Sequence, residues 1–128
     1  MDRIKQLVLP EVADGALITS DINRRYFTGM KSSAGMLLIF KECAYLIIDF
    51  RYIEKARNTV KNCTVMEQEN LTEQINSLMK KHNAKSLAVE SMDMTLSRMS
   101  FLEKKFPDIE FIKSDELSNN IYDMRTIK

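Results

Sequence analysis

The sequence predicts an α/β domain built on a mixed sheet of about six strands, with helices on both faces of the sheet. Its second half alternates short apolar runs with segments whose apolar residues recur at helical spacing. This alternation is typical of parallel strands joined by crossover helices. Two further apolar runs, at residues 35–40 and 43–48, are separated only by Lys41-Glu42 and predict an antiparallel hairpin. Both runs are apolar at successive positions, which indicates a sheet covered on both faces.

The other expected strands are short apolar runs bounded by polar or turn-forming residues. They are predicted at residues 16–19, 64–66, 86–90 and 109–112. Lys-Glu is not a favoured two-residue turn, so a slightly longer hairpin loop stays open.

The expected helices combine apolar residues at three- and four-residue spacing with start or stop signals. A first helix over residues 2–9 ends or kinks at Pro10. A second, short helix begins at Ser20 or Asp21 and ends where Gly29 provides a C-terminal cap. Four more helices are predicted, between Asp49 and Val60 and over residues 70–79, 96–106 and 115–122.

The overall composition fits one globular domain of 128 residues. The net charge is +1, whereas a nucleic-acid-binding protein usually carries a basic excess, so no nucleic-acid partner is expected. The sequence starts without a signal-peptide pattern, and no apolar run is long enough to cross a bilayer. We therefore expect a cytoplasmic protein with no membrane partner, in which Cys43 and Cys63 are free, inert packing thiols.

The residues that could carry chemistry do not form a recognisable catalytic set. His82 is the only histidine and is expected at a helix end, on the surface or as a cap. Ser32 and Ser33 lack the glycine pattern of a nucleophile elbow. Asp49 and Glu90 both end predicted strands and could hold Mg²⁺ if they converged, but capping and solvation of strand ends is the better interpretation. We expect neither catalytic residues nor a metal site in this chain.

The segment Asp49-Phe50-Arg51-Tyr52 is the most informative cluster, because it lies where a strand ends and a helix begins. Crevices at such strand ends are common binding positions in α/β sheets. Asp49 can cap the helix. Arg51 carries a planar charged fork that suits a carboxylate on a substrate or partner. The alternative is that Arg51 forms a salt bridge within the fold or at a subunit contact.

Three ordered blocks give the sequence a family resemblance: Asn23-Arg24-Arg25-Tyr26-Phe27-Thr28-Gly29, Ser33-Ala34-Gly35, and Tyr45-Leu46-Ile47-Ile48-Asp49-Phe50-Arg51-Tyr52. They resemble the amino-terminal domain of Xaa-Pro aminopeptidases and Xaa-Pro dipeptidases, the creatinase/prolidase family. The tail from Ile121 to Lys128 is similar to the segment that leads into the catalytic domain of that family. The resemblance covers residues 1–128 as a single domain. Pro10 and Phe50 depart from the pattern.

The resemblance implies a ribonuclease H-like motif used for packing, and a catalytic "pita-bread" domain absent from this chain. That domain would hold two divalent metals, often manganese, and cleave Xaa-Pro bonds of short peptides. The amino-terminal domain is expected to contact its own catalytic domain, to help form a homo-oligomer and to shape access to the active site. The signature positions implied are Asn23, Tyr26, Gly29, Ser33, Gly35, Asp49, Arg51 and Tyr52. Most are expected to be structural, and Arg51 is the candidate for contact with substrate or partner.

Two other functions stay open for the parent protein. Some relatives with this fold bind partner proteins without catalysis, and creatinase-like hydrolysis is a further alternative. A stand-alone small-molecule or dimerisation domain is the third possibility.

Overall fold

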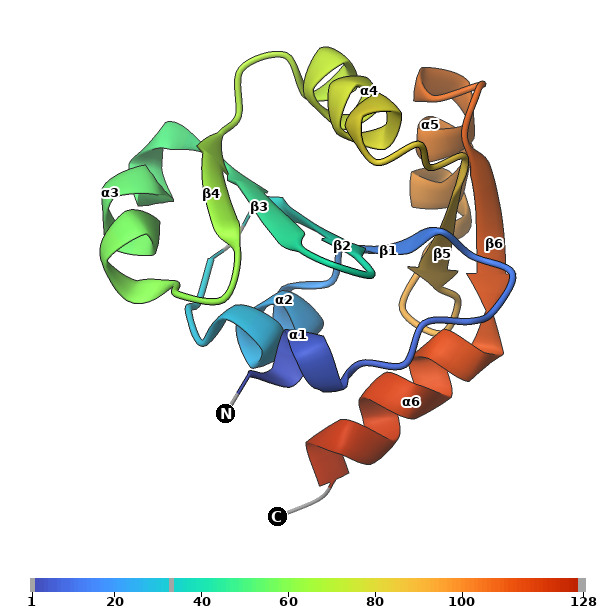
Figure 1. Ribbon diagram of the computed structural model, residues 1–128, viewed down its shortest axis with the longest axis horizontal. Coiled ribbons are helices and arrows are strands. Elements are labelled where there is room, and N and C mark those ends of the chain that lie inside the picture. Colours follow the sequence, from blue (N-terminus) through green and yellow to red (C-terminus); the bar gives the residue numbers. More distant parts are fainter. Residues whose placement is uncertain (1, 33, 127–128) are drawn as a thin grey trace.

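A computed structural model describes residues 2–32 and 34–126 (Figure 1), and Ser33 lies outside the described residues. Within these ranges, six strands form one sheet in the order β4-β3-β2-β1-β5-β6. Strands β1, β2 and β3 pair antiparallel, whereas the pairs β1–β5, β5–β6 and β3–β4 are parallel. The strands are β1 (Gly15–Ile18), β2 (Met36–Phe40), β3 (Ala44–Ile48), β4 (Thr64–Glu67), β5 (Ser86–Glu90) and β6 (Glu110–Ser114). The predicted mixed sheet is therefore confirmed, and the order β3-β2-β1-β5-β6 fits the expected ribonuclease H-like motif.

Helices connect and cover these strands. They are α1 (Arg3–Gln6), α2 (Asp21–Thr28), α3 (Phe50–Thr59), α4 (Leu71–Lys81), α5 (Leu96–Lys105) and α6 (Asp115–Thr126). The first is shorter than the predicted 2–9, because Leu7 already has an extended backbone. Alternate residues of an extended segment share one side, so Leu7 and Leu9 can both pack on the core that contains Ile4. The hairpin loop spans residues 41–43, so the longer of the two open alternatives is correct.

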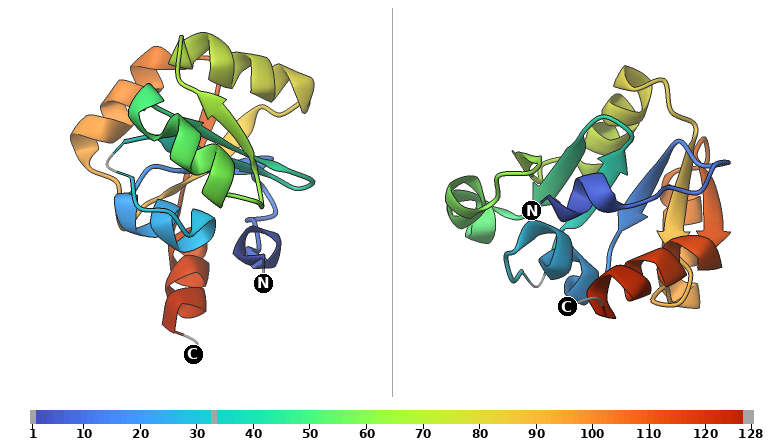
Figure 2. Two further views of the ribbon diagram at one scale, coloured as in Figure 1. Left: turned by 90° about the vertical axis from the view of Figure 1, so that its left-hand side faces the viewer. Right: turned by 60° about the horizontal axis from the view of Figure 1, so that its bottom comes forward.

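The core has two layers, one on each face of the sheet. Buried residues of α1, α2, α3 and α6 form one cluster, and residues of α4 and α5 form the other. Figures 1 and 2 show α4 and α5 on the opposite side of the sheet from α1, α2 and α6. Every residue of β1, β3 and β5 is buried, as the uninterrupted apolar runs predict. Both faces of the sheet are therefore covered.

The strand directions distinguish two edges of the sheet, one at each end of the strands, and different residues lie at each. Because β1, β3, β4, β5 and β6 run the same way, their carboxyl ends share one edge, which we call the carboxyl edge. Helices α2 and α3 begin there, directly after β1 and β3. The β2–β3 loop and the end of α4 lie at the opposite edge, which we call the amino edge. The segment Asp49–Tyr52 and Glu90 thus belong to the carboxyl edge.

Candidate functional site

Asp49 and Arg51 form an ion pair where β3 leads into α3. Asp49 is the N-cap of α3, and its Oδ1 accepts a hydrogen bond from the Arg51 backbone N–H at 2.8 Å. The Arg51 guanidinium donates to the same carboxylate, with 2.9 Å between Nη2 and Oδ2. These side-chain and backbone hydrogen bonds from Arg51 lower the pKa of Asp49. The expected capping by Asp49 is present, and so is the salt bridge within the fold that was the alternative role for Arg51.

Arg51 is nevertheless open to solvent, since 58% of its side chain is exposed. Its guanidinium carbon lies 5.5 Å from the centre of the Tyr52 ring. Tyr52 in turn lines an open hollow of about 350 Å³, whose charged lining is mostly basic: Asp21, Arg25, Lys31 and Lys55. Phe50, the departure from the family pattern, is 72% exposed. The geometry thus leaves Arg51 able to meet an external carboxylate.

Glu90 is fully buried at the end of β5, so the expectation that it is solvated at a strand end is wrong. Its Oε1 atom accepts hydrogen bonds from the backbone N–H groups of both Thr19 and Ser20, at 2.6 and 3.1 Å. The Ser20 hydroxyl, at 2.7 Å, and the Asn23 amide donate as well. These donors explain the burial, because a carboxylate without such partners would be costly to remove from water. Glu90 therefore fixes the turn from β1 into α2.

Asn23 connects three separate parts of the carboxyl edge. Its side-chain amide donates to Glu90 and, at 3.3 Å, to Asp93 in the turn after β5. Its carbonyl Oδ1 accepts a hydrogen bond at 3.1 Å from Nη1 of Arg125, in the last turn of α6. Asn23, the first signature residue, thus joins α2 to the end of β5 and to α6.

Arg24 is a buried cation that the sequence reasoning missed. Only 1% of it is exposed, and its guanidinium donates to the backbone carbonyls of Thr19, Ser32 and Gly35 at 2.9, 2.8 and 3.1 Å. It also donates to the Ser32 hydroxyl and pairs with the exposed carboxylate of Asp21. Arg24 thereby closes the loop between α2 and β2 over the start of α2. Helical phase was the available signal, because Phe27 and Thr28 lie three and four residues further along the same buried face.

The remaining signature residues serve the backbone and the packing around α2. Gly29 caps α2 with φ 76°, and Gly35 has φ 131°, a conformation that residues with a side chain rarely adopt. A Cβ at Gly35 would lie 3.0 Å from the carbonyl oxygen of Ile47. Tyr26 packs edge-on against Phe27 and carries the Arg3 guanidinium over its ring. Ser33 is the one signature residue outside the described ranges.

Neither carboxylate considered for Mg²⁺ is arranged as a metal ligand. Asp49 is paired with Arg51, and Glu90 is surrounded by hydrogen-bond donors. Among residues 2–32 and 34–126, no group of three or more histidine, cysteine, aspartate or glutamate side chains is placed to hold a metal ion. Over the same ranges, none of the helices is both long and apolar enough to cross a membrane.

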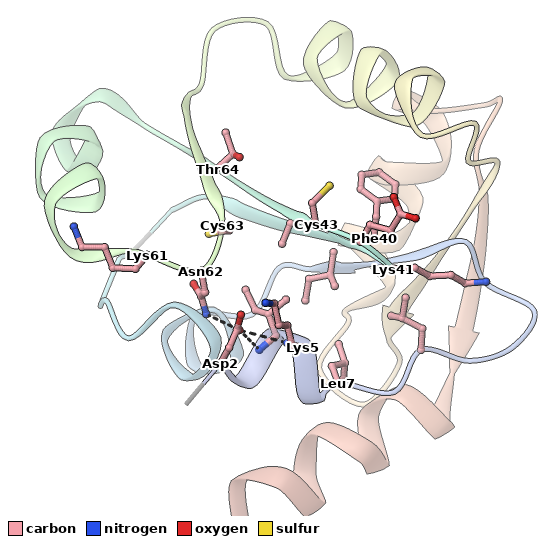
Figure 3. A pocket seen from close by; sticks show the side chains of 15 residues that line it. Asp2, Lys5, Leu7, Phe40, Lys41, Cys43, Lys61, Asn62, Cys63 and Thr64 are labelled. Atoms are coloured by element: carbon pink, nitrogen blue, oxygen red, sulfur yellow. Dashed lines mark hydrogen bonds between the residues drawn. The ribbon is translucent and has the colours of Figure 1, made fainter.

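A groove of about 690 Å³ lies between α1, the β2–β3 hairpin and the start of β4 (Figure 3). Asp2 and Asn62 meet within it, and the amide of Asn62 donates to the backbone carbonyl of Phe27 at 2.8 Å. Both cysteines are among its lining residues, together with Lys5, Lys41 and Lys61. The Oδ1 atom of Asn62 is buried and has no hydrogen-bond partner among the described residues.

The strand order and the strand directions define an α/β domain of ribonuclease H-like type. Residues 1–127 match the Creatinase/Prolidase N-terminal domain family, and the chain belongs to that family. The chain is 30% identical over 129 residues to a Bacillus subtilis protein described as the uncharacterized peptidase YqhT, covering 100% of this chain and 36% of that protein.

Solved structures show the same fold. An Xaa-Pro dipeptidase from Bacillus anthracis superposes with a TM-score of 0.79 at 29% identity, over 91% of this chain and 32% of that one. A proline dipeptidase structure from Streptococcus pneumoniae TIGR4 matches with a TM-score of 0.80 at 24% identity and covers 100% of both chains. The present chain spans about a third of the length of the curated relatives that it matches.

Proposed function

We propose that this chain is the non-catalytic amino-terminal domain of a metal-dependent peptidase that cleaves Xaa-Pro bonds of short peptides. The observation that carries the proposal is the family match over residues 1–127, combined with relatives that are about three times as long. A Bacillus anthracis relative is an Xaa-Pro dipeptidase, which supports the reaction class. The free thiols Cys43 and Cys63 fit a cytoplasmic location, which we also propose.

The proposal divides the work between this chain and the rest of the parent. Hydrolysis by a two-metal centre needs several carboxylate and histidine ligands that converge, and the catalytic domain of the parent would supply them. Two divalent metals, manganese in our proposal, would there activate the attacking water. This chain would contribute a rigid surface, because hydrogen bonds of Glu90, Asn23 and Arg24 hold the loops of the carboxyl edge against the sheet.

In the parent, the domain is proposed to contact its own catalytic domain, to help form a homo-oligomer and to restrict access to short proline-containing peptides. Arg51 is the residue we assign to the contact with substrate or partner. Its fork is exposed at the carboxyl edge, and the hollow beside Tyr52 adds the basic residues Arg25, Lys31 and Lys55. A peptide carboxylate or an acidic side chain of a neighbouring subunit suits this surface.

Replacing Arg51 with alanine in the full-length gene product is expected to raise KM for Xaa-Pro peptides at least about threefold with little change in kcat, because uniform binding energy is lost. If Arg51 instead contacts a partner subunit, the variant should have a lower oligomer mass, measured by light scattering after size-exclusion chromatography. The matched control is Arg57→Ala, since Arg57 is an exposed arginine on the same helix. Identical KM and identical mass in R51A and R57A would contradict the assignment. A full-length product with no Xaa-Pro cleavage at all would contradict the proposed function itself.

A further inference from the structure

A thiol, a phenol and an imidazole meet at the amino edge, whereas Arg51 lies at the carboxyl edge. Cys43 ends the β2–β3 loop, Tyr45 lies two residues later in β3, and His82 caps the end of α4. The His82 Nε2 atom is 2.8 Å from the Tyr45 hydroxyl and 3.4 Å from the Cys43 sulfur. The thiol also donates to the Tyr45 hydroxyl at 3.6 Å. Three elements thus bring one nucleophile and one proton acceptor into contact.

The imidazole of His82 is held in place from several sides. Its ring stacks on Phe40 with 4.3 Å between ring centres, and it packs edge-on against Tyr45. The backbone N–H of His82 donates to the carbonyl of Leu78, so the ring sits at the carboxyl terminus of α4. Lys80 and Lys81, in the same helical turn, and Lys41 and Glu42, in the loop, are the nearest charged residues along these elements.

Tyr45 serves as a relay and not as a base. Burial first, and then the hydrogen bond with Cys43, raise the pKa of Tyr45 to about 12, so its hydroxyl keeps its proton near neutral pH. A protonated hydroxyl can accept a hydrogen bond from the thiol while it donates one to His82 Nε2. This places Tyr45 between the thiol and the ring nitrogen that would accept its proton.

Cys63 provides a contrast within the same chain. It packs against the core cluster on the other face of the sheet from Cys43. In Figure 3 the Cys43 side chain points away from Asp2 and Asn62, and Cys63 lies apart from it. Burial, reinforced by the negative charge of Asp2, raises the pKa of Cys63 to about 12. Since the thiolate is the nucleophile, Cys63 is expected to be unreactive while folded.

We propose that Cys43, Tyr45 and His82 form a modification site, in which a small hydroperoxide oxidises the thiol of Cys43 to a sulfenic acid. The sulfur attacks the terminal peroxide oxygen, so that a sulfur–oxygen bond forms as the oxygen–oxygen bond breaks. The thiol proton passes to His82 through the Tyr45 hydroxyl and returns to the leaving oxygen, which departs as water or an alcohol. The sulfur loses two electrons and the peroxide gains them, so a thiol and a hydroperoxide become a sulfenic acid and water or an alcohol.

The test uses the 128-residue chain with hydrogen peroxide and dimedone, which traps sulfenic acids, and follows each cysteine peptide by mass spectrometry. In the wild-type chain, Cys43 is expected to be labelled at least about a hundredfold faster than Cys63, because their thiols differ in environment as described. Equal rates at the two cysteines would overturn the proposal.

Two variants test whether His82 assists the oxidation of Cys43 as a base, or whether Cys43 reacts only because its thiol is exposed. His82→Phe keeps a ring to stack on Phe40 but removes the proton acceptor, and Tyr45→Phe removes the relay hydroxyl. General-base assistance is worth at least about tenfold, so H82F is expected to slow Cys43 by that factor, and Y45F by a smaller one. Cys63 reports folding, because its rate rises if a variant unfolds. A Cys43 rate in H82F equal to wild type, with Cys63 still protected, would refute the role of the imidazole. If Cys63 becomes reactive in H82F, that variant has unfolded and Y45F provides the test instead. An unchanged Cys43 rate in Y45F would contradict the proposal.

Discussion

The Glu90→Ala variant is expected to lose about 3–4 kcal/mol of unfolding free energy, because several buried hydrogen-bond donors lose their acceptor at once. The backbone N–H groups of Thr19 and Ser20 and the amide of Asn23 all point at the Glu90 carboxylate. Water entering the space left by the side chain would satisfy part of this loss, which keeps the expected value below the sum of the separate penalties. Urea denaturation followed by circular dichroism measures the change, with an unaltered m-value as the sign that the folded state is otherwise intact.

Two further variants show that the acceptors and not merely the volume matter. Glu90→Gln keeps the shape but turns one oxygen into a donor that faces other donors, so about 2 kcal/mol should be lost. Glu110→Ala, at an exposed position on the neighbouring strand β6, should stay within about 0.5 kcal/mol of wild type. An E90A variant as stable as E110A would disprove the structural role of this carboxylate.

Replacing Arg24 with methionine is the second large effect, with an expected loss of about 2–3 kcal/mol. Methionine retains an unbranched apolar stem in the buried space and deletes the guanidinium. The carbonyl oxygens of Ser32 and Gly35 then lose a buried donor, and the loop between α2 and β2 loses its anchor. Amide hydrogen exchange should therefore quicken around residues 34–36 before it changes in β5, in addition to the shift in the urea midpoint.

Arg25 offers the matched control for Arg24. It is the next residue of the same helix but is exposed, so Arg25→Met should change stability by less than about 0.5 kcal/mol. Arg24→Lys should fall between the two, because an ammonium keeps the charge but cannot span three carbonyls as the guanidinium fork does. Equal stabilities of R24M and R25M would contradict the assigned anchoring role.

Features that depend on neighbouring residues could be predicted from the sequence. The cap at Gly29 and the cap at Asp49 each involve residues within one helical turn of the capping position. The hairpin and the alternation after it follow from apolar periodicity alone, and the fully buried strands follow from the unbroken apolar runs. The helix over residues 3–6 was overestimated in length because packing of Leu7 and Leu9 on the core, and not local propensity, decides where it ends.

The polar network could not be predicted, since it depends on contacts between distant residues. Glu90 lies 71 residues from Thr19 in sequence, and Asn23 lies 102 residues from Arg125. A strand-end glutamate looks like a solvated residue until β1 and β5 are known to be adjacent and parallel. The same holds for His82, which lies at the end of α4 as expected and occupies the C-cap position through its backbone. Its imidazole does not meet the helix carbonyls, and its contacts with Cys43 and Tyr45 require β3 and α4 to meet at the amino edge.

Peptide hydrolysis by the purified 128-residue chain tests the central claim most directly. The chain is incubated with an Xaa-Pro dipeptide and an Xaa-Pro tripeptide in the presence of Mn²⁺, and free amino acids are quantified by mass spectrometry against the same buffer without protein. We expect no release above the buffer, because we propose that the ligands of the two-metal centre belong to the catalytic domain of the parent. Release that co-elutes with the chain, depends on Mn²⁺ and stops when a chelator is added would contradict the account.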